Sequence, residues 1–244
     1  MARQNTLSRI APFATAPGQQ SALSFLLMRP ANTIATATLA IVAMITLIAC
    51  APTSSSEAPA FTPLPYADDF SDPNSGWETL SDLNADVKYD AGALRIVVKL
   101  ENLTQWSSAG KRFKDAIFEV DARPNGGPTD NGFGVLFRMQ DRKNFYHFEI
   151  SSDGYWRAGY VQDGDWNNWD DWQPHPAIRP GGETNRIKVV MQGDKLSFFV
   201  NDQLVSSRED GTFTSGDIGV FALTLIDAPG TDVSFDNVRV SEVK

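Results

Sequence analysis

The sequence is poor in the residues from which most metal centres and covalent catalytic sites are built. It contains one cysteine, Cys50, and two histidines, His147 and His175, in 244 residues. A single cysteine excludes a disulfide within the chain, and two distant histidines without a companion cysteine give no support to a zinc site. The sequence also lacks a glycine-rich phosphate loop after a predicted strand and a nucleophile elbow.

Positive charge is scarce as well. The chain has 21 Lys and Arg residues against 30 Asp and Glu residues, for a formal net charge of -9. An acidic protein of this kind is repelled by nucleic acid and by anionic lipid surfaces. We therefore expect no nucleic-acid partner, and any membrane attachment has to come from an anchor.

The N-terminal region carries such an anchor in its sequence. Residues 33–50, TIATATLAIVAMITLIAC, contain no charge, and the only charges before them are three arginines. A basic segment followed by an apolar one predicts an export signal. The ending LIAC resembles the bacterial lipobox, whose cysteine is diacylated and becomes the mature N-terminus. We predict a signal peptide over 1–49 and lipidation of Cys50, or alternatively an uncleaved membrane anchor.

The lipidated cysteine would attach an extracytoplasmic protein to the lipid bilayer. Residues 51–65, APTSSSEAPAFTPLP, are rich in Pro, Ser, Thr and Ala and have no hydrophobic period. Such a stretch buries too little apolar area to offset its ordering entropy. We expect the lipidated Cys50 and a flexible linker over 50–65, followed by one domain over 66–244.

Apolar residues alternate with a period of two through this domain, which is typical of strands buried on one side. No apolar 3.6-residue period is sustained over three turns, so the pattern predicts an antiparallel β-sandwich or jelly roll. Gly193-Asp194 between two rows predicts a tight hairpin. The rows are Leu94, Ile96, Val98 and Leu100; Phe133, Val135, Phe137 and Met139; Ile187, Val189 and Met191; and Leu196, Phe198 and Val200.

Four segments together resemble the concanavalin A-like lectin/glucanase superfamily, and within it the laminin G-like and 3-keto-disaccharide hydrolase-like jelly rolls. They are DDFSDPNSGW, NGFGVLFRMQDRKNFYHFEISSDG, TNRIKVVMQGDKLSFFVNDQLV and VSFDNVRV. The resemblance implies an all-β, two-sheet antiparallel sandwich. Its motifs are mostly structural, so it implies a fold rather than an activity.

The segment QDGDWNNWDDWQP places three tryptophans among Asp, Asn, Gln and Gly, just after a strand with further aromatics. Indole rings stack on the apolar faces of sugars, and polar neighbours contact the hydroxyls. The alternative is that the rings pack a long loop onto the domain, with Trp169 as the buried one, or contact a protein partner. The predicted carbohydrate-binding residues are Trp166, Trp172, Trp156, Tyr160, Asp163, Asn167 and Asp170.

A paired-carboxylate glycosidase requires two acids that flank one glycosidic bond. Glu119 and Asp121 share one face of a predicted strand, and the superfamily's glucanases carry the related run Glu-x-Asp-x-x-Glu. Pro124 occupies the third position here, so we assign no catalytic residues and retain Glu119, Asp121 and Glu149 as candidates only. His147 is predicted to be a strand residue satisfied by a neighbour.

The superfamily resemblance also implies a structural calcium where the first and last strands meet. Asp69 and Asp236 are the candidate ligands, because an inward carboxylate at a strand irregularity needs a partner. Hydrogen bonds from backbone amides or from Arg239 would do nearly as well, so one structural calcium is an alternative, and the sequence indicates no other cofactor.

The sequence thus predicts a membrane-tethered lipoprotein whose domain binds a glycan or polysaccharide without cleaving it. The alternatives are a glycoside-acting hydrolase and a protein-interaction module of the cell envelope.

Overall fold

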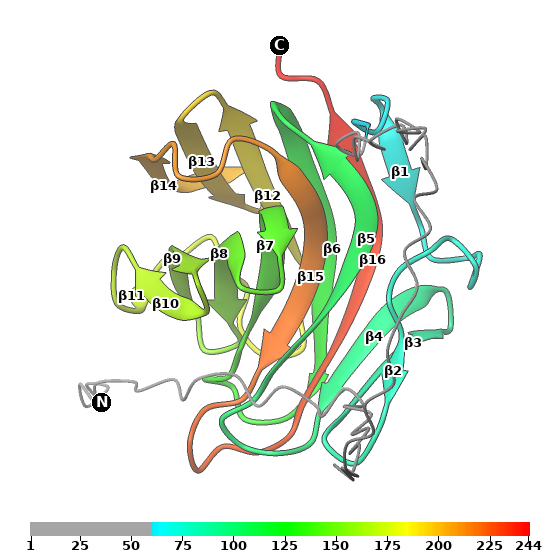
Figure 1. Ribbon diagram of the computed structural model, residues 1–244. Coiled ribbons are helices and arrows are strands. Elements are labelled where there is room, and N and C mark those ends of the chain that lie inside the picture. The colour runs from blue at the N-terminus through cyan, green and yellow to red at the C-terminus, as the bar shows by residue number, and fades with distance from the viewer. Residues whose placement is uncertain (1–59) are drawn as a thin grey trace, which may run out of the picture. The chain divides into compact units, whose positions relative to one another are not determined.

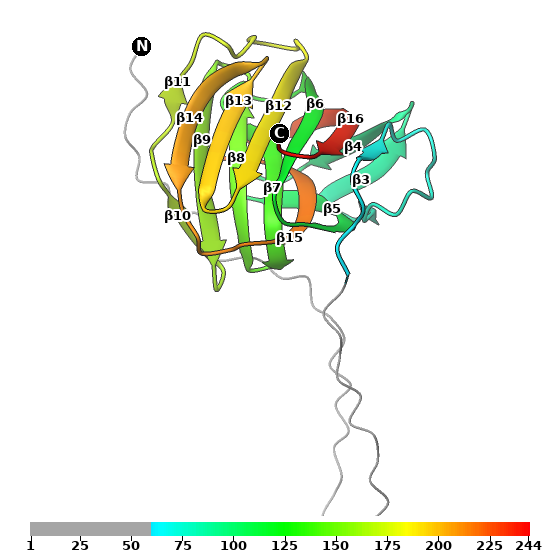
Figure 2. The ribbon, with the colours of Figure 1, turned by 90° about the horizontal axis from the view of Figure 1, so that it is seen from above.

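The computed structural model describes residues 60–244, which form two antiparallel sheets packed face to face (Figure 1, Figure 2). Residues 1–59, which include Cys50 and most of the predicted linker, lie outside the described residues. Residues 60–244 hold no helix that is long and apolar enough to span a membrane.

One sheet has nine strands and the other has seven, and the predicted two-sheet sandwich is confirmed. The nine-stranded sheet has the spatial order β14 (Gln203–Glu209), β13 (Lys195–Val200), β12 (Asn185–Gln192), β6 (Ala116–Gly126), β16 (Thr231–Ser241), β4 (Ala93–Val98), β3 (Ala85–Asp90) and β2 (Leu80–Ser81), with β1 (Tyr66–Asp68) paired to β16. The seven-stranded sheet has the order β10 (Asp165–Asn168), β9 (Tyr155–Gln162), β8 (Asn144–Ser151), β7 (Gly132–Asp141), β15 (Gly216–Leu223) and β5 (Thr104–Phe113), with β11 (Gln173–Pro174) paired to β9.

Strands form at the predicted rows of alternating apolar residues, and the predicted hairpin between two of these rows is present. β12 and β13 pair with Gln192 opposite Lys195, so the predicted hairpin turns at Gly193 and its neighbour. Gly193 has a φ of 56°, a left-handed conformation that glycine adopts without strain. One row was expected to continue to Leu100, but β4 ends at Val98 and Leu100 is exposed.

The main core lies between the sheets and is built from alternate residues of each strand. On β6, Phe118 and Val120 point into it, whereas Glu119 and Asp121 point outward from the nine-stranded sheet. Alternate side chains of a strand point to opposite faces of the sheet, so one face of this sheet is buried and the other is exposed to solvent.

The seven-stranded sheet is different, because its central strands are buried on both faces. Every residue of β8 from Phe145 to Ser151 is buried. The face away from the main core, here called the outer face, carries a second hydrophobic cluster against which Trp166 and Leu225 pack. Its buried members are Trp106, Leu136, Met139, Phe145, Val161, Phe221 and Leu223.

Contacts of the sandwich begin ahead of Tyr66, where the sequence places the start of the domain. The Thr62 N–H donates to the Arg112 carbonyl oxygen at 2.8 Å, and the Arg112 N–H donates to Thr62 Oγ1 at 3.1 Å. Leu64 also packs against the main core. The last residues of the predicted linker thus run along β5, which composition alone does not indicate.

Candidate functional site

The tryptophan-rich segment leaves β9 and folds back along the edge of the seven-stranded sheet. β10 and β11 both pair with β9, with Trp166 opposite Val161 and Gln173 opposite Trp156. The three tryptophans of the segment are all partly buried. Their rings, however, cover different parts of the domain.

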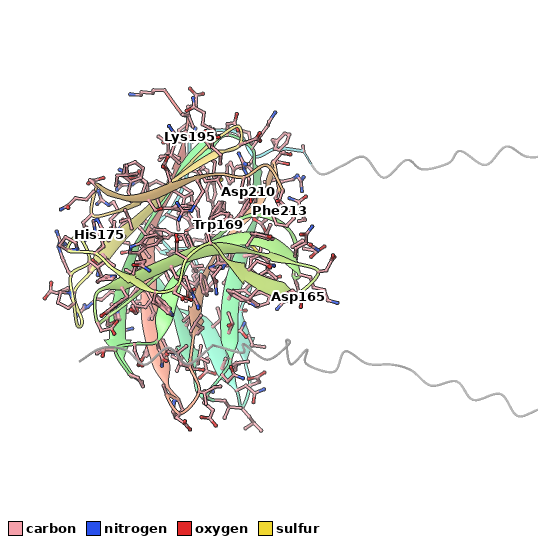
Figure 3. All side chains as sticks on the ribbon, turned by 90° about the vertical axis from the view of Figure 1, so that its left-hand side faces the viewer. Asp165, Trp169, His175, Lys195, Asp210 and Phe213 are labelled. Carbon is pink, nitrogen blue, oxygen red and sulfur yellow. The ribbon has the colours of Figure 1, made fainter. Side chains whose placement is uncertain are left out.

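Trp169 turns into the space between the sheets. Its ring centroid lies 5.8 Å from that of Tyr146 and 6.0 Å from that of Phe198. Figure 3 shows Trp169 at the middle of this edge, beside Asp210 and Phe213, and its side chain hydrogen-bonds to Asp210. Trp169 therefore anchors the segment to the main core, in the packing role that the sequence predicts for it.

Trp166 lies on the outer face instead. Its ring centroid is 4.7 Å from that of His147, 6.0 Å from that of Phe145 and 6.5 Å from that of Phe221. His147 and Phe145 belong to β8 and Phe221 to β15. A side chain from the edge strand thus reaches across the sheet to its middle.

Trp172 covers the neighbouring part of the same face. The guanidinium carbon of Arg157 lies 4.6 Å from the centroid of the Trp172 ring, a cation–π contact. A Cβ built on Gly132 of β7 would lie 3.1 Å from Trp172 Cη2. The indole therefore extends from β9 to β7, above β8.

Glycines make room for these rings. A Cβ at Gly132 would meet Glu149 Oε2 at 2.4 Å, and a Cβ at Gly159 would meet His147 Nε2 at 2.8 Å. Gly159 is paired with His147, so the position beside the imidazole on β9 has no side chain. The floor of the outer face is flat at these points because the sequence places glycine there.

Beneath the two indoles lies a cluster of buried polar side chains. His147 and Glu149 are fully buried, and Arg157 is 2% exposed. Arg157 Nε donates to Glu149 Oε1 at 2.8 Å, and Arg157 Nη2 lies 2.8 Å from the same oxygen. Among residues 60–244, neither ring nitrogen of His147 nor Glu149 Oε2 has a hydrogen-bond partner.

Burial dominates the electrostatics of this cluster. It raises the pKa of the Glu149 carboxyl, against the opposing effect of the Arg157 charge. It lowers the pKa of the His147 imidazole well below its usual range, and the Arg157 charge adds to this effect. His147 is therefore neutral. The expectation that a neighbour satisfies His147 is wrong. Glu149 Oε1 lies 3.5 Å from His147 Nδ1, but neither ring nitrogen has a hydrogen-bond partner among residues 60–244.

Two of the aromatics predicted to bind sugar face the other way. Trp156 is 7% exposed and belongs to the main core, and Tyr160 packs against that core and against Trp169. Trp156 and Tyr160 alternate along β9 in step with Ala158, so all three side chains point between the sheets, whereas Arg157 points outward. The structure therefore does not bring Trp156 and Tyr160 together with Trp166 and Trp172.

The polar residues of the predicted set lie on the exposed side of the segment. Asp163 is in the turn between β9 and β10, where its N–H donates to Asn144 Oδ1 at 3.0 Å. Asn167 is exposed on β10. Asp170 forms an ion pair with Arg208 of β14, and this contact ties the segment to the nine-stranded sheet.

The three candidate catalytic acids lie on opposite sides of the molecule. Glu119 and Asp121 face outward from the nine-stranded sheet, where they form ion pairs with Lys188 and Arg186 respectively. Glu149 faces outward from the seven-stranded sheet. The main core separates them, so Glu149 cannot share a glycosidic bond with Glu119 or Asp121.

Asp69 and Asp236, the predicted calcium ligands, lie close enough to interact electrostatically. Burial raises the pKa of Asp236, and the charges of Asp121 and Asp69 add to it. The Asp236 Oδ1 accepts from the Asn237 N–H at 2.6 Å. Residues 60–244 contain no group of three or more His, Cys, Asp or Glu side chains arranged to hold a metal ion. Calcium binding therefore stays a prediction.

A family model described as a 3-keto-alpha-glucoside-1,2-lyase-like domain matches residues 69–241. The chain belongs to this family. The match covers almost the whole described sandwich, including every residue of the buried cluster. The family that the sequence resembles is thereby confirmed. Among proteins with curated descriptions, none matches this chain.

Solved structures share the fold at low sequence identity. The carbohydrate-binding module CBM66 from Bacillus subtilis has a TM-score of 0.52 and 17% identity, over 67% of this chain and 93% of the module. A β-glucanase from Bacillus licheniformis has a TM-score of 0.56 and 11% identity, over 73% and 98% of the two chains. The catalytic domain of an endo-1,3-β-glucanase from Thermotoga petrophila has a TM-score of 0.53 and 13% identity, over 73% and 97%. These likenesses confirm the jelly-roll fold.

Sequence reasoning missed Arg157 and the glycines of the outer face. A signal was present, because His147 and Glu149 alternate with the apolar residues Tyr146, Phe148 and Ile150 in the run YHFEI. That alternation puts both polar groups on one face. Their burial depends on Trp166 and Trp172, which come from a separate segment.

Proposed function

We propose that the domain binds carbohydrate, without cleaving it, on the outer face of the seven-stranded sheet. The observation that carries this proposal is the placement of Trp166 and Trp172, which lie across the face and stay partly exposed. An indole ring packs well against the apolar face of a pyranose. Asn167, exposed on the same edge strand, can hydrogen-bond to hydroxyl groups of the ligand.

The comparisons support a glycan as the ligand. One neighbour in fold is called a carbohydrate-binding module, and others are called glucanases. The family takes its name from an activity on a keto-glucoside. All of these names concern sugars, although the identities are low and the fold hosts several activities.

The distribution of acids favours binding over hydrolysis. A glycosidase uses two carboxyl groups about 5 to 10 Å apart on either side of the scissile bond. Glu149 is fully buried and held by Arg157, while Glu119 and Asp121 lie beyond the main core. None of them forms such a pair with Glu149.

Isothermal titration of the purified protein against laminarin, chitooligosaccharides and maltooligosaccharides tests the proposal. We expect binding to at least one of them, weakened roughly tenfold by Trp166→Ala or Trp172→Ala, which corresponds to about 1.4 kcal/mol. Leu204→Ala removes an exposed apolar side chain from β14, on the other sheet, and serves as the control. The proposal would be contradicted if neither Trp166→Ala nor Trp172→Ala changed the affinity.

A second candidate is a sugar-cleaving reaction in the buried cluster. The family name and the buried pair of Glu149 and neutral His147 favour it, because enzymes place titratable groups in such environments. Incubation with glucosides and 3-keto-glucosides, followed by chromatography of released sugars, distinguishes the candidates. Turnover that Glu149→Gln abolishes would replace the binding proposal by an enzymatic one.

We also propose that the protein is extracytoplasmic and attached to a membrane through lipidated Cys50. The support is the charge-free run that ends in LIAC, together with the absence of any other cysteine in the sequence. A tether of this kind would present many weak sites together and raise the avidity for a polysaccharide. Metabolic labelling with radioactive palmitate tests this, with Cys50→Ser as the control that should carry no label.

A further inference from the structure

Glu149 and His147, beneath the indoles, have hydrogen-bonding atoms that the described residues leave unmet. They are Oε2 of Glu149 and both ring nitrogens of His147, of which Nδ1 lies 3.5 Å from Glu149 Oε1. Unmet buried polar atoms destabilise a fold, and apolar residues of similar shape would avoid that penalty. Packing alone therefore does not explain why an acid and an imidazole occupy these positions.

Neighbouring strands leave space beside these atoms. The Cβ that an alanine would add at Gly132 lies 2.4 Å from Glu149 Oε2, and that at Gly159 lies 2.8 Å from His147 Nε2. Any residue other than glycine would push against the unmet atom. The two glycines keep the approach to Glu149 and His147 free of strand side chains.

The indoles of Trp172 and Trp166 provide the cover. Both are partly exposed, and their backbone lies in or beside β10 and β11, strands of four and two residues at the sheet edge. Side-chain rotation is fast compared with movement of a sheet. Because Trp169 anchors the segment to the main core, the two indoles can turn outward while the edge strands stay paired.

The unmet atoms define the chemistry of the ligand. A carboxylate oxygen only accepts hydrogen bonds, while a neutral imidazole has one donor and one acceptor. A hydroxyl group donates and accepts, so two adjacent hydroxyls complete the set on Glu149 and His147. Glu149 repels an anionic ligand and Arg157 repels a cationic one. The cluster therefore fits a neutral pyranose with adjacent hydroxyl groups.

We propose that Glu149 and His147 form a buried hydroxyl-binding subsite, which opens when the indoles of Trp172 and Trp166 turn outward. This inference rests on the proposed carbohydrate binding. It adds the residues that would read the hydroxyl pattern of the bound sugar, beneath the rings that stack on it.

His147→Phe tests the subsite in binding experiments. Phenylalanine retains a ring between Trp166 and Phe221 but has no polar atom, so the variant should fold and yet bind the best oligosaccharide of the titration panel at least tenfold more weakly. Gly132→Ala, which places a methyl group against Glu149 Oε2, should weaken binding similarly, and Gly182→Ala is the matched control because its Cβ meets only the Pro124 carbonyl oxygen at 3.6 Å.

The outcomes separate the two proposals. If no oligosaccharide binds the wild-type protein, the proposed function fails and the subsite fails with it. If Trp166→Ala weakens binding but His147→Phe and Gly132→Ala do not, the stacking surface stands and the subsite is refuted.

Opening of the indoles is tested without a ligand by diethyl pyrocarbonate, which acylates accessible neutral imidazoles. The chain has two histidines, and the partly exposed His175 is the internal reference for mass spectrometry. We expect His147 to be acylated in the folded protein and to be protected at least tenfold by the bound oligosaccharide. Acylation of His175 alone under native conditions would refute the opening.

Discussion

Replacing His147 by phenylalanine should stabilise the folded protein. The imidazole is fully buried, its centroid is 4.7 Å from that of Trp166 and 6.4 Å from that of Phe221, and its nitrogens make no hydrogen bond within residues 60–244. Phenylalanine can retain both ring contacts. Because each unmet buried polar group costs ~1–3 kcal/mol, we expect a gain of about 1 kcal/mol or more at pH 7.5.

The gain should increase in acid. Burial keeps the pKa of His147 in the folded state well below the 6.5 of the unfolded chain. Below pH 6.5 the unfolded chain therefore binds a proton that the folded protein does not, and stability falls by up to about 1.4 kcal/mol per pH unit until the folded pKa is reached. The variant lacks this loss.

The groups that face His147 do not obscure the effect. Burial raises the pKa of Glu149 above its usual 4.5, so this carboxyl protonates first in the folded state and stabilises it as the pH falls toward 4.5. Glu149, Arg157 and His175 are present in the wild type and in the variant, so the difference between the two proteins reports the removal of His147.

Urea unfolding followed by tryptophan fluorescence and by circular dichroism measures this difference. Midpoints at pH values from about 7.5 down to about 5, with equal m-values in both proteins, give the change in unfolding free energy. A difference that stays constant across this range would refute the burial argument, because it would show that His147 titrates alike in the folded and unfolded states.

Two further changes test the packing of the sandwich. Trp169→Ala should lower the unfolding free energy by about 2–3 kcal/mol, because it removes the ring that joins the edge segment to the main core. Urea unfolding midpoints measure this loss. A loss below about 0.5 kcal/mol would contradict the role of Trp169 as an anchor. Gly216→Ala should cost about 3 kcal/mol, because its Cβ would lie 2.3 Å from the Arg138 carbonyl carbon and 2.4 Å from the Met139 oxygen. The same measurement on Gly182→Ala should show a change near zero, and equal effects of the two alanines would contradict this account.

The fold could be predicted from the sequence because strand alternation is a local signal. Phe118 and Val120 on β6 alternate with Glu119 and Asp121, so the buried and wet faces are distinct in the sequence itself. The order of the strand segments along the chain was then enough to show the resemblance to known jelly rolls. Both predictions are confirmed by the structure and by the family match.

The site was harder to predict because the central strands of the seven-stranded sheet are buried on both faces. On β9, Trp156 and Tyr160 share one parity and Arg157 and Val161 the other, and both sets contain apolar residues. Sequence proximity to the tryptophan-rich segment suggested that Trp156 belongs to the surface. Parity was the better guide, but it assigns a face only after the neighbouring strands are known.

The buried cluster could not be derived from spacing at all. His147 and Glu149 lie on β8, Arg157 on β9 and Gly132 on β7, and they meet through the pairing of three strands. Their cover comes from a fourth segment that returns along the sheet edge. Strand register and loop path are non-local properties. The residue types therefore indicated which side chains could bind a ligand, but not which of them lie together in the fold.

A two-layer sandwich needs to bury only one face of each sheet. The nine-stranded sheet of this protein follows that rule, with Glu119 and Asp121 in ion pairs on its outside. The seven-stranded sheet does not, and what covers its outer face over the cluster is a pair of indoles rather than a third layer. Rings that are partly exposed and attached to an edge segment are easier to displace than a packed layer, because fewer contacts are lost. If the domain binds carbohydrate as proposed, that difference would explain how one face of a stable sandwich is both buried and open to a ligand.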